Sequence, residues 1–125
     1  MHSCRLTMNG RCDLNIVVDI HGTRMKVRVL IDTGFVRQTG YGLKLPASLA
    51  QYAYPTGTAS IALADGEPVL AQAIPNARIV EIEGRPCDFT MPTLFMDGPR
   101  VIGMKFLERC ILNIDGPASS AKLEF

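Results

Sequence analysis

The sequence has no tryptophan, only two histidines, no marked excess of charge of one sign and no long hydrophobic run. The net charge is +1 at pH 7 and aromatic residues make up 6% of the 125 residues, so a nucleic-acid surface of clustered basic residues and stacking rings has little support. No apolar stretch approaches the roughly 18 residues that span a bilayer, and no signal-type apolar core follows a basic amino-terminal segment. We therefore expect a cytoplasmic protein that binds neither nucleic acid nor membrane.

Cysteine and histidine are also too scarce and too scattered for the common metal and nucleophile sites. The chain has four cysteines, at positions Cys4, Cys12, Cys87 and Cys110. They lack the short paired spacing of zinc ligands and the density of a disulfide scaffold, which favours reduced thiols. His2 and His21 are the only imidazoles, and neither lies beside a recognisable nucleophile. We expect no metal site, no cofactor and no Ser-His or Cys-His catalysis.

What the chain does contain is the composition of one domain rich in short strands. Its 47% hydrophobic and 20% charged residues suit a single domain over residues 1–125 with its own core, in which residues 1–13 are either poorly ordered or part of an interface. Alternating apolar and polar residues predict a hairpin of residues 14–20 and 25–31 around a turn at 21–23. A short helical turn is expected at 47–50. Further strands are expected at 58–63, 69–74, 78–83, 87–95, 111–115 and 122–125.

The most informative feature is Asp32, which with Thr33 and Gly34 follows the apolar end of the second predicted strand. An unpaired carboxylate is costly out of water, so its site must supply hydrogen bonds, a shared proton or access to solvent. Acid-base catalysis is one reason for such a residue, and a hydrogen-bonded structural turn is another. Far downstream, Val101, Ile102 and Gly103 precede a short helix-like segment at 104–110.

Together, these two segments resemble those of the retropepsin-like aspartic proteases, and the resemblance extends from about residue 14 to residue 125. The chain is similar to small stand-alone bacterial or archaeal members that carry Asp-Thr-Gly-Phe, with Phe35 where alanine or serine is commoner. The resemblance implies an all-β acid-protease barrel with one short helix after the Val-Ile-Gly strand, assembled as a homodimer. It implies a peptide or protein substrate and no metal or organic cofactor.

The same resemblance assigns roles to individual residues. Asp32 is the catalytic residue, and the paired Asp32 carboxylates of a homodimer activate the water that hydrolyses a peptide bond. Two chains are needed because the other Asp-Gly pairs of the sequence lack the intervening Ser or Thr. Thr33, Gly34 and Gly103 support the site: Thr33 braces the two active-site loops, and the glycines allow close packing around the carboxylates.

The hairpin of residues 58–74 corresponds in position to the flap that covers bound substrate in such enzymes. Its Asp65-Gly66 pair is a two-residue turn signal, which makes Asp65 and Gly66 candidate tip residues. Phe35 and Ile102 are possible substrate-pocket residues, although core packing has about twice the weight for an aromatic residue after a buried strand.

Two other functions compete with the protease. One is a noncatalytic peptide-binding or dimerisation module on the same fold, because a fold does not establish activity. The other is a structural or regulatory β-barrel in which Asp32 only stabilises a turn. Replacing Asp32 by asparagine discriminates between them, because an enzyme loses turnover with its dimer intact whereas a binding module keeps its binding.

Overall fold

The computed structural model describes residues 2–8, 11–35, 40–53, 57–62 and 68–125, with the backbone alone described at 7, 57–62 and 68–69. The chain is almost entirely β-structure. In chain order its elements are β1 (Ser3–Thr7), β2 (Asp13–Ile20), β3 (Thr23–Ile31), β4 (Leu43–Leu45), the 3-10 helix η1 (Ala47–Tyr52), β5 (Gly57–Ala62), β6 (Pro68–Ile82), β7 (Arg85–Phe95), β8 (Val101–Ile102), α1 (Met104–Leu107), β9 (Ile111–Asp115) and β10 (Ser120–Glu124).

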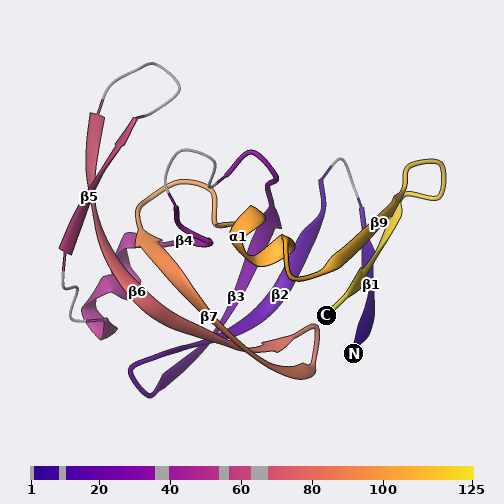
Figure 1. Cartoon of the computed structure of the whole chain (residues 1–125), viewed down its shortest axis with the longest axis horizontal. Helices are drawn as coiled ribbons and strands as arrows, with labels where there is room; N and C mark the ends of the chain where they lie inside the picture. The colour runs from indigo at the N-terminus through magenta and orange to yellow at the C-terminus, as the bar shows by residue number, and fades with distance from the viewer. Residues whose placement is uncertain (1, 9–10, 36–39, 54–56, 63–67) are drawn as a thin grey trace.

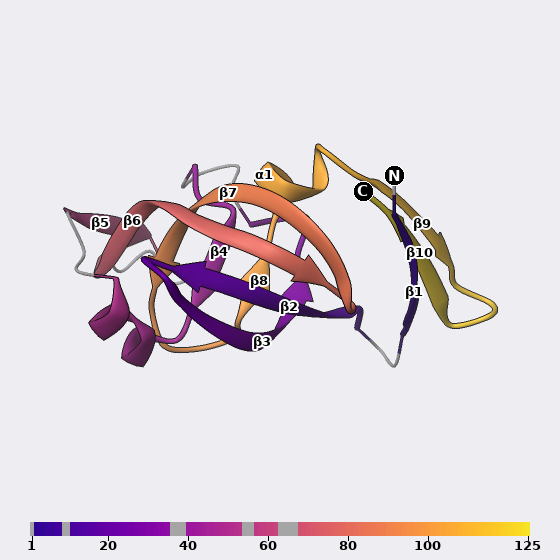
Figure 2. The same ribbon diagram turned by 90° about the horizontal axis from the view of Figure 1, so that it is seen from below.

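The described strands form two sheets. The larger has the order β2-β3-β8-β4-β7-β6-β5, and an additional pairing of β2 with β6 closes it into a barrel. The smaller has the order β1-β10-β9 and lies at one side of the barrel, with the two chain ends next to each other (Figures 1 and 2). Residues of the amino-terminal segment thus pair with the carboxy-terminal strand of the same chain, from Ser3 with Glu124 to Thr7 with Ser120.

The hairpin of β2 and β3 follows from its sequence pattern. Every second residue of β2, from Leu14 to Ile20, is buried, and Val27 and Val29 of β3 are buried opposite them. The strands reverse at His21 and Gly22, whose φ angles are 49° and 92°. Those positive values suit the turn of a two-residue hairpin, and glycine adopts them without steric cost.

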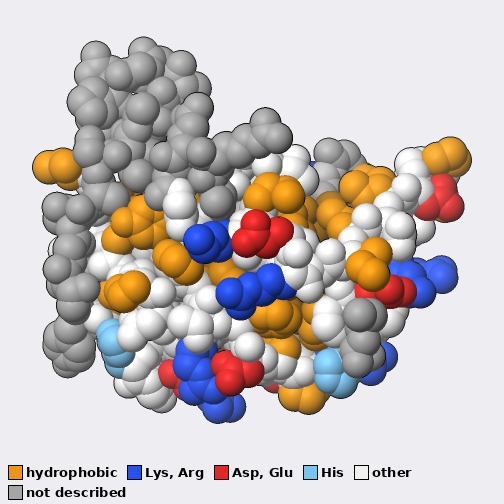
Figure 3. Space-filling model, in the orientation of Figure 1, with side chains coloured by type: hydrophobic (Ala, Val, Ile, Leu, Met, Phe, Trp, Pro, Cys, Tyr) orange, Lys and Arg blue, Asp and Glu red, His pale blue; other side chains and the backbone are white. Residues whose placement is uncertain are grey.

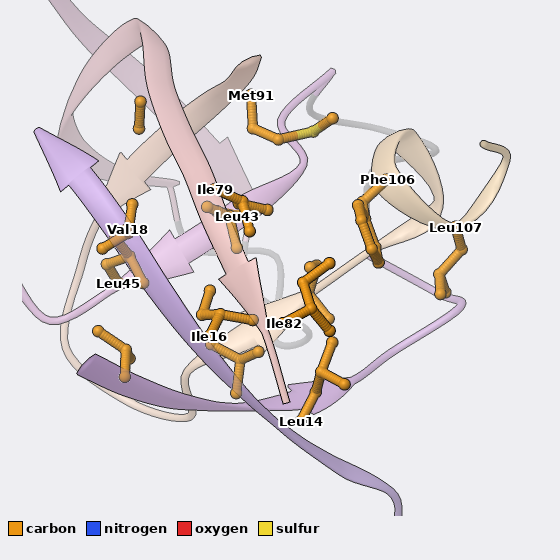
Figure 4. Packing of buried hydrophobic residues seen from close by; sticks show 14 of the residues in the cluster. Leu14, Ile16, Val18, Leu43, Leu45, Ile79, Ile82, Met91, Phe106 and Leu107 are labelled. Atoms are coloured by element: carbon orange, nitrogen blue, oxygen red, sulfur yellow. The ribbon is translucent and has the colours of Figure 1, made fainter. Parts of the chain in front are cut away.

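The core lies inside the barrel and under α1. Leu14, Ile16 and Val18 point inward from β2 toward side chains of the strands opposite, as Figure 4 shows. Phe106 of α1 is fully buried and meets Phe89 of β7 edge to face, with ring centroids 5.1 Å apart. This contact anchors the short helix on the barrel, because aromatic pairs add stabilisation beyond the area they bury.

The all-β class, the first hairpin, the helical turn at η1 and the helix after the Val-Ile-Gly strand confirm the expectations from sequence. The homodimer stays a prediction.

Three expected boundaries are wrong. The helix ends at Leu107 rather than at residue 110. The strands expected at 69–74 and 78–83 are one strand, β6. The turn after it lies at Glu83 and Gly84, where both φ angles are positive, so Arg85 already belongs to β7.

Candidate active site

Asp32 lies at the carboxyl end of β3 and is fixed there by β8. The two strands run parallel, with Leu30 paired to Val101 and Ile31 paired to Ile102. The Asp32 amide continues the ladder by donating to the Ile102 carbonyl at 3.0 Å. The two segments singled out in the sequence are therefore neighbours in space, and the backbone that carries the half-buried Asp32 is held by both.

A tight turn after β3 orients the Asp32 carboxylate. The Gly34 amide donates to Asp32 Oδ1 at 2.9 Å, and the Phe35 amide donates to the Asp32 carbonyl at 3.2 Å. A β-carbon on Gly34 would lie 3.2 Å from Oδ1, closer than side chains normally approach. Glycine thus allows the amide to reach the carboxylate. Within the described residues no donor is bonded to Oδ2, which leaves that oxygen for a proton, a water molecule or a second carboxylate.

Two buried glycines, Gly103 and Gly42, pack next to the strand β8 that holds the Asp32 backbone. The Gly103 amide donates to the Gly42 carbonyl at 2.9 Å, and the Gly42 amide donates to the Pro92 carbonyl at 2.8 Å. A β-carbon on Gly42 would lie 2.6 Å from Met91 Sδ, so no side chain fits there without rearrangement. Sequence reasoning identified Gly103 and missed Gly42, whose signal was its place in the glycine-rich stretch 40–42.

The possible pocket residues lie in different surroundings. Ile102 has no exposed surface, which places it in the core. Phe35 is half-buried and packs with Tyr41 and Met96 against a small second cluster. That cluster consists of Ala71, Ala73 and Leu94, from β6 and β7. The Phe35 carbonyl also accepts a hydrogen bond from the Met104 amide at 3.3 Å, so Phe35 connects the turn to α1.

Thr33 is exposed at the turn, and within the described part of the chain its hydroxyl makes no hydrogen bond. The hydroxyl is therefore available to a group from outside the chain. Its bracing role concerns a second subunit and stays a prediction.

The candidate flap is the hairpin of β5 and β6, in which Gly57 pairs with Ala73 and Ala62 pairs with Pro68. It projects from the barrel on the same side as the turn that follows β3 (Figure 1). Asp65 and Gly66, the expected tip residues, lie outside the described residues. On β6, Leu70 is 75% exposed, which is unusual for a leucine and leaves an apolar side chain on this hairpin without a partner in the described residues.

Sequence reasoning missed a charged cluster around Asp13, the residue of β2 that pairs with Leu30 of β3. Asp13 Oδ2 accepts from Arg28 Nε at 3.0 Å and lies 3.3 Å from Arg11 Nε, and the Asp13 side chain is only 10% exposed. These residues line a recess of about 330 Å³ together with Leu30 and Arg100. No local sequence pattern predicts this cluster, because Arg100 lies far from the other members along the chain.

Of the four thiols, that of Cys12 is buried and those of Cys4, Cys87 and Cys110 are half-buried. All four cysteines are free. Burial raises the pKa of the Cys87 and Cys110 thiols to about 11, with Asp88 adding to the effect at Cys87. Because the thiolate is the nucleophilic form, these residues are poor nucleophiles at neutral pH.

Among the described residues, no three His, Cys, Asp or Glu side chains converge in a way that could hold a metal ion. No helix in the described part of the chain is long and apolar enough to span a membrane. On the face seen in Figure 3, basic and acidic side chains lie next to one another, and they form no single basic patch.

Comparison with known proteins identifies the fold. No protein-family model matches the chain, and no curated protein matches it in sequence. Among solved structures, it is similar to the crystal structure of a retropepsin-like aspartic protease from Rickettsia conorii, with a TM-score of 0.63 and 19% sequence identity. The match covers 99% of this chain and 91% of that one. The chain therefore has the retropepsin-like fold over its whole length.

Proposed function

We propose that this protein is an aspartic endopeptidase whose active site contains the Asp32 residues of two identical chains. One observation carries the proposal: in a chain with the retropepsin-like fold, the half-buried carboxylate of Asp32 follows β3, with one oxygen held by the Gly34 amide. The bond from the Gly34 amide is a turn contact that engages only Oδ1, and within the described residues Oδ2 has no donor. The other oxygen, Oδ2, is the one that takes part in proton transfer.

The homodimer follows from the chemistry. Hydrolysis of this kind needs two close carboxyl groups that share one proton, because two like charges at contact distance do not both stay ionised. No other aspartate of this sequence stands in an Asp-Thr-Gly setting. A twofold axis places the same residue of each subunit at one point, so a dimer about Asp32 supplies the pair. The exposed Thr33 hydroxyls then lie near the axis and brace the two turns.

In the reaction, the ionised member of the Asp32 pair takes a proton from a water molecule as that water attacks the peptide carbonyl. The protonated member donates a hydrogen bond to the carbonyl oxygen, which gains negative charge. Transfer of a proton to the nitrogen then lets the amine leave, and the pair returns to its singly protonated form.

The substrate is an extended segment of peptide or protein. The projecting β5–β6 hairpin supports this assignment, because a two-stranded flap presents backbone groups to a peptide strand and excludes water when it closes. Asp65 and Gly66 are proposed tip residues, and Phe35 links the flap base to the catalytic turn through its cluster on β6 and β7.

The test is digestion of a diverse peptide mixture by wild-type protein and by Asp32→Asn from acidic to neutral pH, followed by mass spectrometry. We expect cleavage by the wild type and none by the variant, with equal oligomeric mass and equal thermal stability. Asp88→Asn is the matched control. It makes the same chemical change at an exposed aspartate of β7 whose ion pair with Arg78 is screened by solvent and adds little to stability, and it should cleave like the wild type.

Other outcomes would favour the competing functions. A folded wild-type dimer that cleaves nothing, and whose peptide binding survives Asp32→Asn, would indicate a noncatalytic binding module. Loss of folding or assembly in Asp32→Asn, with no cleavage by the wild type at any pH, would indicate a structural barrel in which Asp32 stabilises the turn.

A further inference from the structure

A recess rich in arginine lies next to the candidate active site. It measures about 330 Å³. We call it the arginine recess, and its charged lining residues are Arg11, Arg28, Arg100 and Asp13. Leu30 and the segment Gly98–Arg100 also line it. The recess therefore joins residues from the start of β2, the end of β3 and the approach to β8.

The recess carries a surplus of positive charge. Among the described residues that line it, Asp13 is the one carboxylate, and it is already engaged by Arg28 Nε at 3.0 Å and Arg11 Nε at 3.3 Å. Arg100 is exposed, and within the described residues no carboxylate pairs with it. The described lining therefore contains three guanidinium groups and one carboxylate. A guanidinium group is weakly hydrated and its planar donors match a carboxylate, so the unpaired Arg100 is suited to bind an anion.

The backbone places this charge beside Asp32. Leu30 and Asp32 are alternate residues at the end of β3, and side chains two residues apart in an extended chain lie on the same face about 7 Å apart. The Leu30 amide donates to the Arg100 carbonyl at 2.8 Å, just as the Asp32 amide donates to the Ile102 carbonyl at 3.0 Å. An extended peptide advances about 3.3 Å per residue. If the substrate bond to be hydrolysed lies at Asp32, the substrate side chain two or three residues away from that bond reaches the recess.

We propose that the arginine recess binds an acidic side chain of the peptide substrate, with Arg100 as the residue that determines this specificity. The inference rests on the proposed peptide-binding function and adds a substrate class to it. Asp13 has a positioning role: it holds Arg11 and Arg28 along one wall and leaves Arg100 free to pair with aspartate or glutamate of the substrate. The contact selects among substrates and takes no part in proton transfer.

The experiment measures binding apart from cleavage. Fluorescently labelled nine-residue peptides with a common sequence of small and apolar residues carry Glu, Gln or Lys at one position, which is moved along the peptide. Their affinities for the Asp32→Asn protein are measured by fluorescence anisotropy, with and without the additional change Arg100→Glu. The control is Arg85→Glu, which makes the same charge change at an exposed arginine at the start of β7.

We expect the Glu peptide to bind about three to ten times more tightly than the Gln peptide at one or two positions on one side of the peptide centre, as partly solvated charge-assisted contacts allow. The preference should weaken with added salt. Arg100→Glu should abolish it and favour the Lys peptide, with unchanged oligomeric mass, whereas Arg85→Glu should retain it.

Equal affinity for the Glu and Gln peptides at every position would overturn the proposal. So would an equal loss of binding for all three peptides in Arg100→Glu, which would indicate a structural role for Arg100. Failure of the proposed hydrolysis is distinguishable, because in that case the wild type cleaves nothing while the Glu preference and its dependence on Arg100 persist.

Discussion

At the scale of single residues, the candidate site depends on how closely backbone groups approach Asp32. The Gly34 amide reaches Oδ1 at 2.9 Å because Gly34 has no β-carbon in the way. Gly103 and Gly42 support the same turn through the hydrogen bond between them. These glycines position the carboxylate, and the proposed proton transfer belongs to Asp32 alone.

Gly34→Ala tests this dependence. The added β-carbon would lie 3.2 Å from Asp32 Oδ1, so the carboxylate must shift by a few tenths of an ångström. We expect peptidase activity to fall by about 10- to 100-fold, because small misplacements of catalytic groups are costly. The free energy of unfolding should change by no more than about 1 kcal/mol. Activity assays and denaturant unfolding measure the two effects.

The control is Gly116→Ala in the β9–β10 turn, where an added β-carbon meets nothing within 4 Å. This variant should retain full activity. An active Gly34→Ala protein would contradict the role assigned to the glycine.

The half-buried thiols of Cys87 and Cys110 predict how the free energy of unfolding depends on pH. The ordinary thiol pKa is 9.0, and burial raises it to about 11 at Cys87 and Cys110 in the folded protein. The unfolded chain therefore ionises first, so the stabilisation is complete below pH 9 and is lost as the pH rises toward 11. Thermal unfolding measured from pH 8 to pH 11 should show this loss, and the double variant Cys87→Ala, Cys110→Ala should show a shallower decline. If the thermal stability of the wild type and of the double variant fell equally with pH, the raised pKa values of the two thiols would be contradicted.

The site residues differ in how visible they are in the sequence. Asp32, Gly34 and Gly103 were predictable because short motifs carry them. Gly42 was not, because the atoms that exclude a side chain there belong to Met91 and Lys105, which are distant along the chain. The arginine recess was hidden for the same reason, since it is assembled by the pairing of β3 with β8.

At the scale of elements, β6 connects the proposed flap to the barrel. It is one strand of 15 residues, although the sequence reads as two strands separated by Pro75 and Asn76. The pairing with β7 shifts register between Ile74 and Ala77, which bracket these two residues. A bulge accommodates a proline that cannot donate to the ladder, so a residue that usually ends a strand only bends this one.

The elements missed by the sequence analysis are short and depend on distant partners. β4 has three residues and is held between β7 and β8, and β1 is defined by its pairing with β10 at the other end of the chain. Local patterns carry little information about such strands. By contrast, the hairpin of β2 and β3 is local, alternates strongly and was predicted to within two residues.

The hairpin itself gives a prediction through Leu70, which is 75% exposed. If β5 and β6 form the flap, this apolar side chain serves substrate contact, so Leu70→Ser should raise KM severalfold. The free energy of unfolding should change by less than about 0.5 kcal/mol, as expected for an exposed position. Peptidase kinetics and urea unfolding test both. Unchanged KM would argue against a flap at this hairpin.

At the scale of the whole molecule, the small sheet beside the barrel has two open edges. β1 and β9 each pair with β10, and among the described strands neither has a second neighbour in that sheet. Ile111 and Ile114 of the edge strand β9 are 49% and 59% exposed. An exposed apolar edge strand is a liability that proteins usually cover. A second copy of the chain would cover it and would also complete the pair of Asp32 residues.

Ile114→Lys tests whether this edge lies in the dimer. Burying an unpaired ammonium group at the interface is unfavourable, so we expect the dimer to dissociate at least tenfold more readily and activity to fall in parallel at low protein concentration. Analytical ultracentrifugation and activity measured over a dilution series give the two results. Thr90→Lys, at an exposed position of β7, is the control. A dimer unaffected by Ile114→Lys would place the interface elsewhere.

The most direct test of the central claim mixes wild-type protein with Asp32→Asn at constant total concentration, after subunits have exchanged. If each active site needs Asp32 from two chains, a mixed dimer is inactive and activity follows the square of the wild-type fraction, so an equal mixture retains about one quarter of the wild-type activity. Activity proportional to the wild-type fraction, with about one half retained in that mixture, would show that one chain suffices and would contradict the paired Asp32 mechanism.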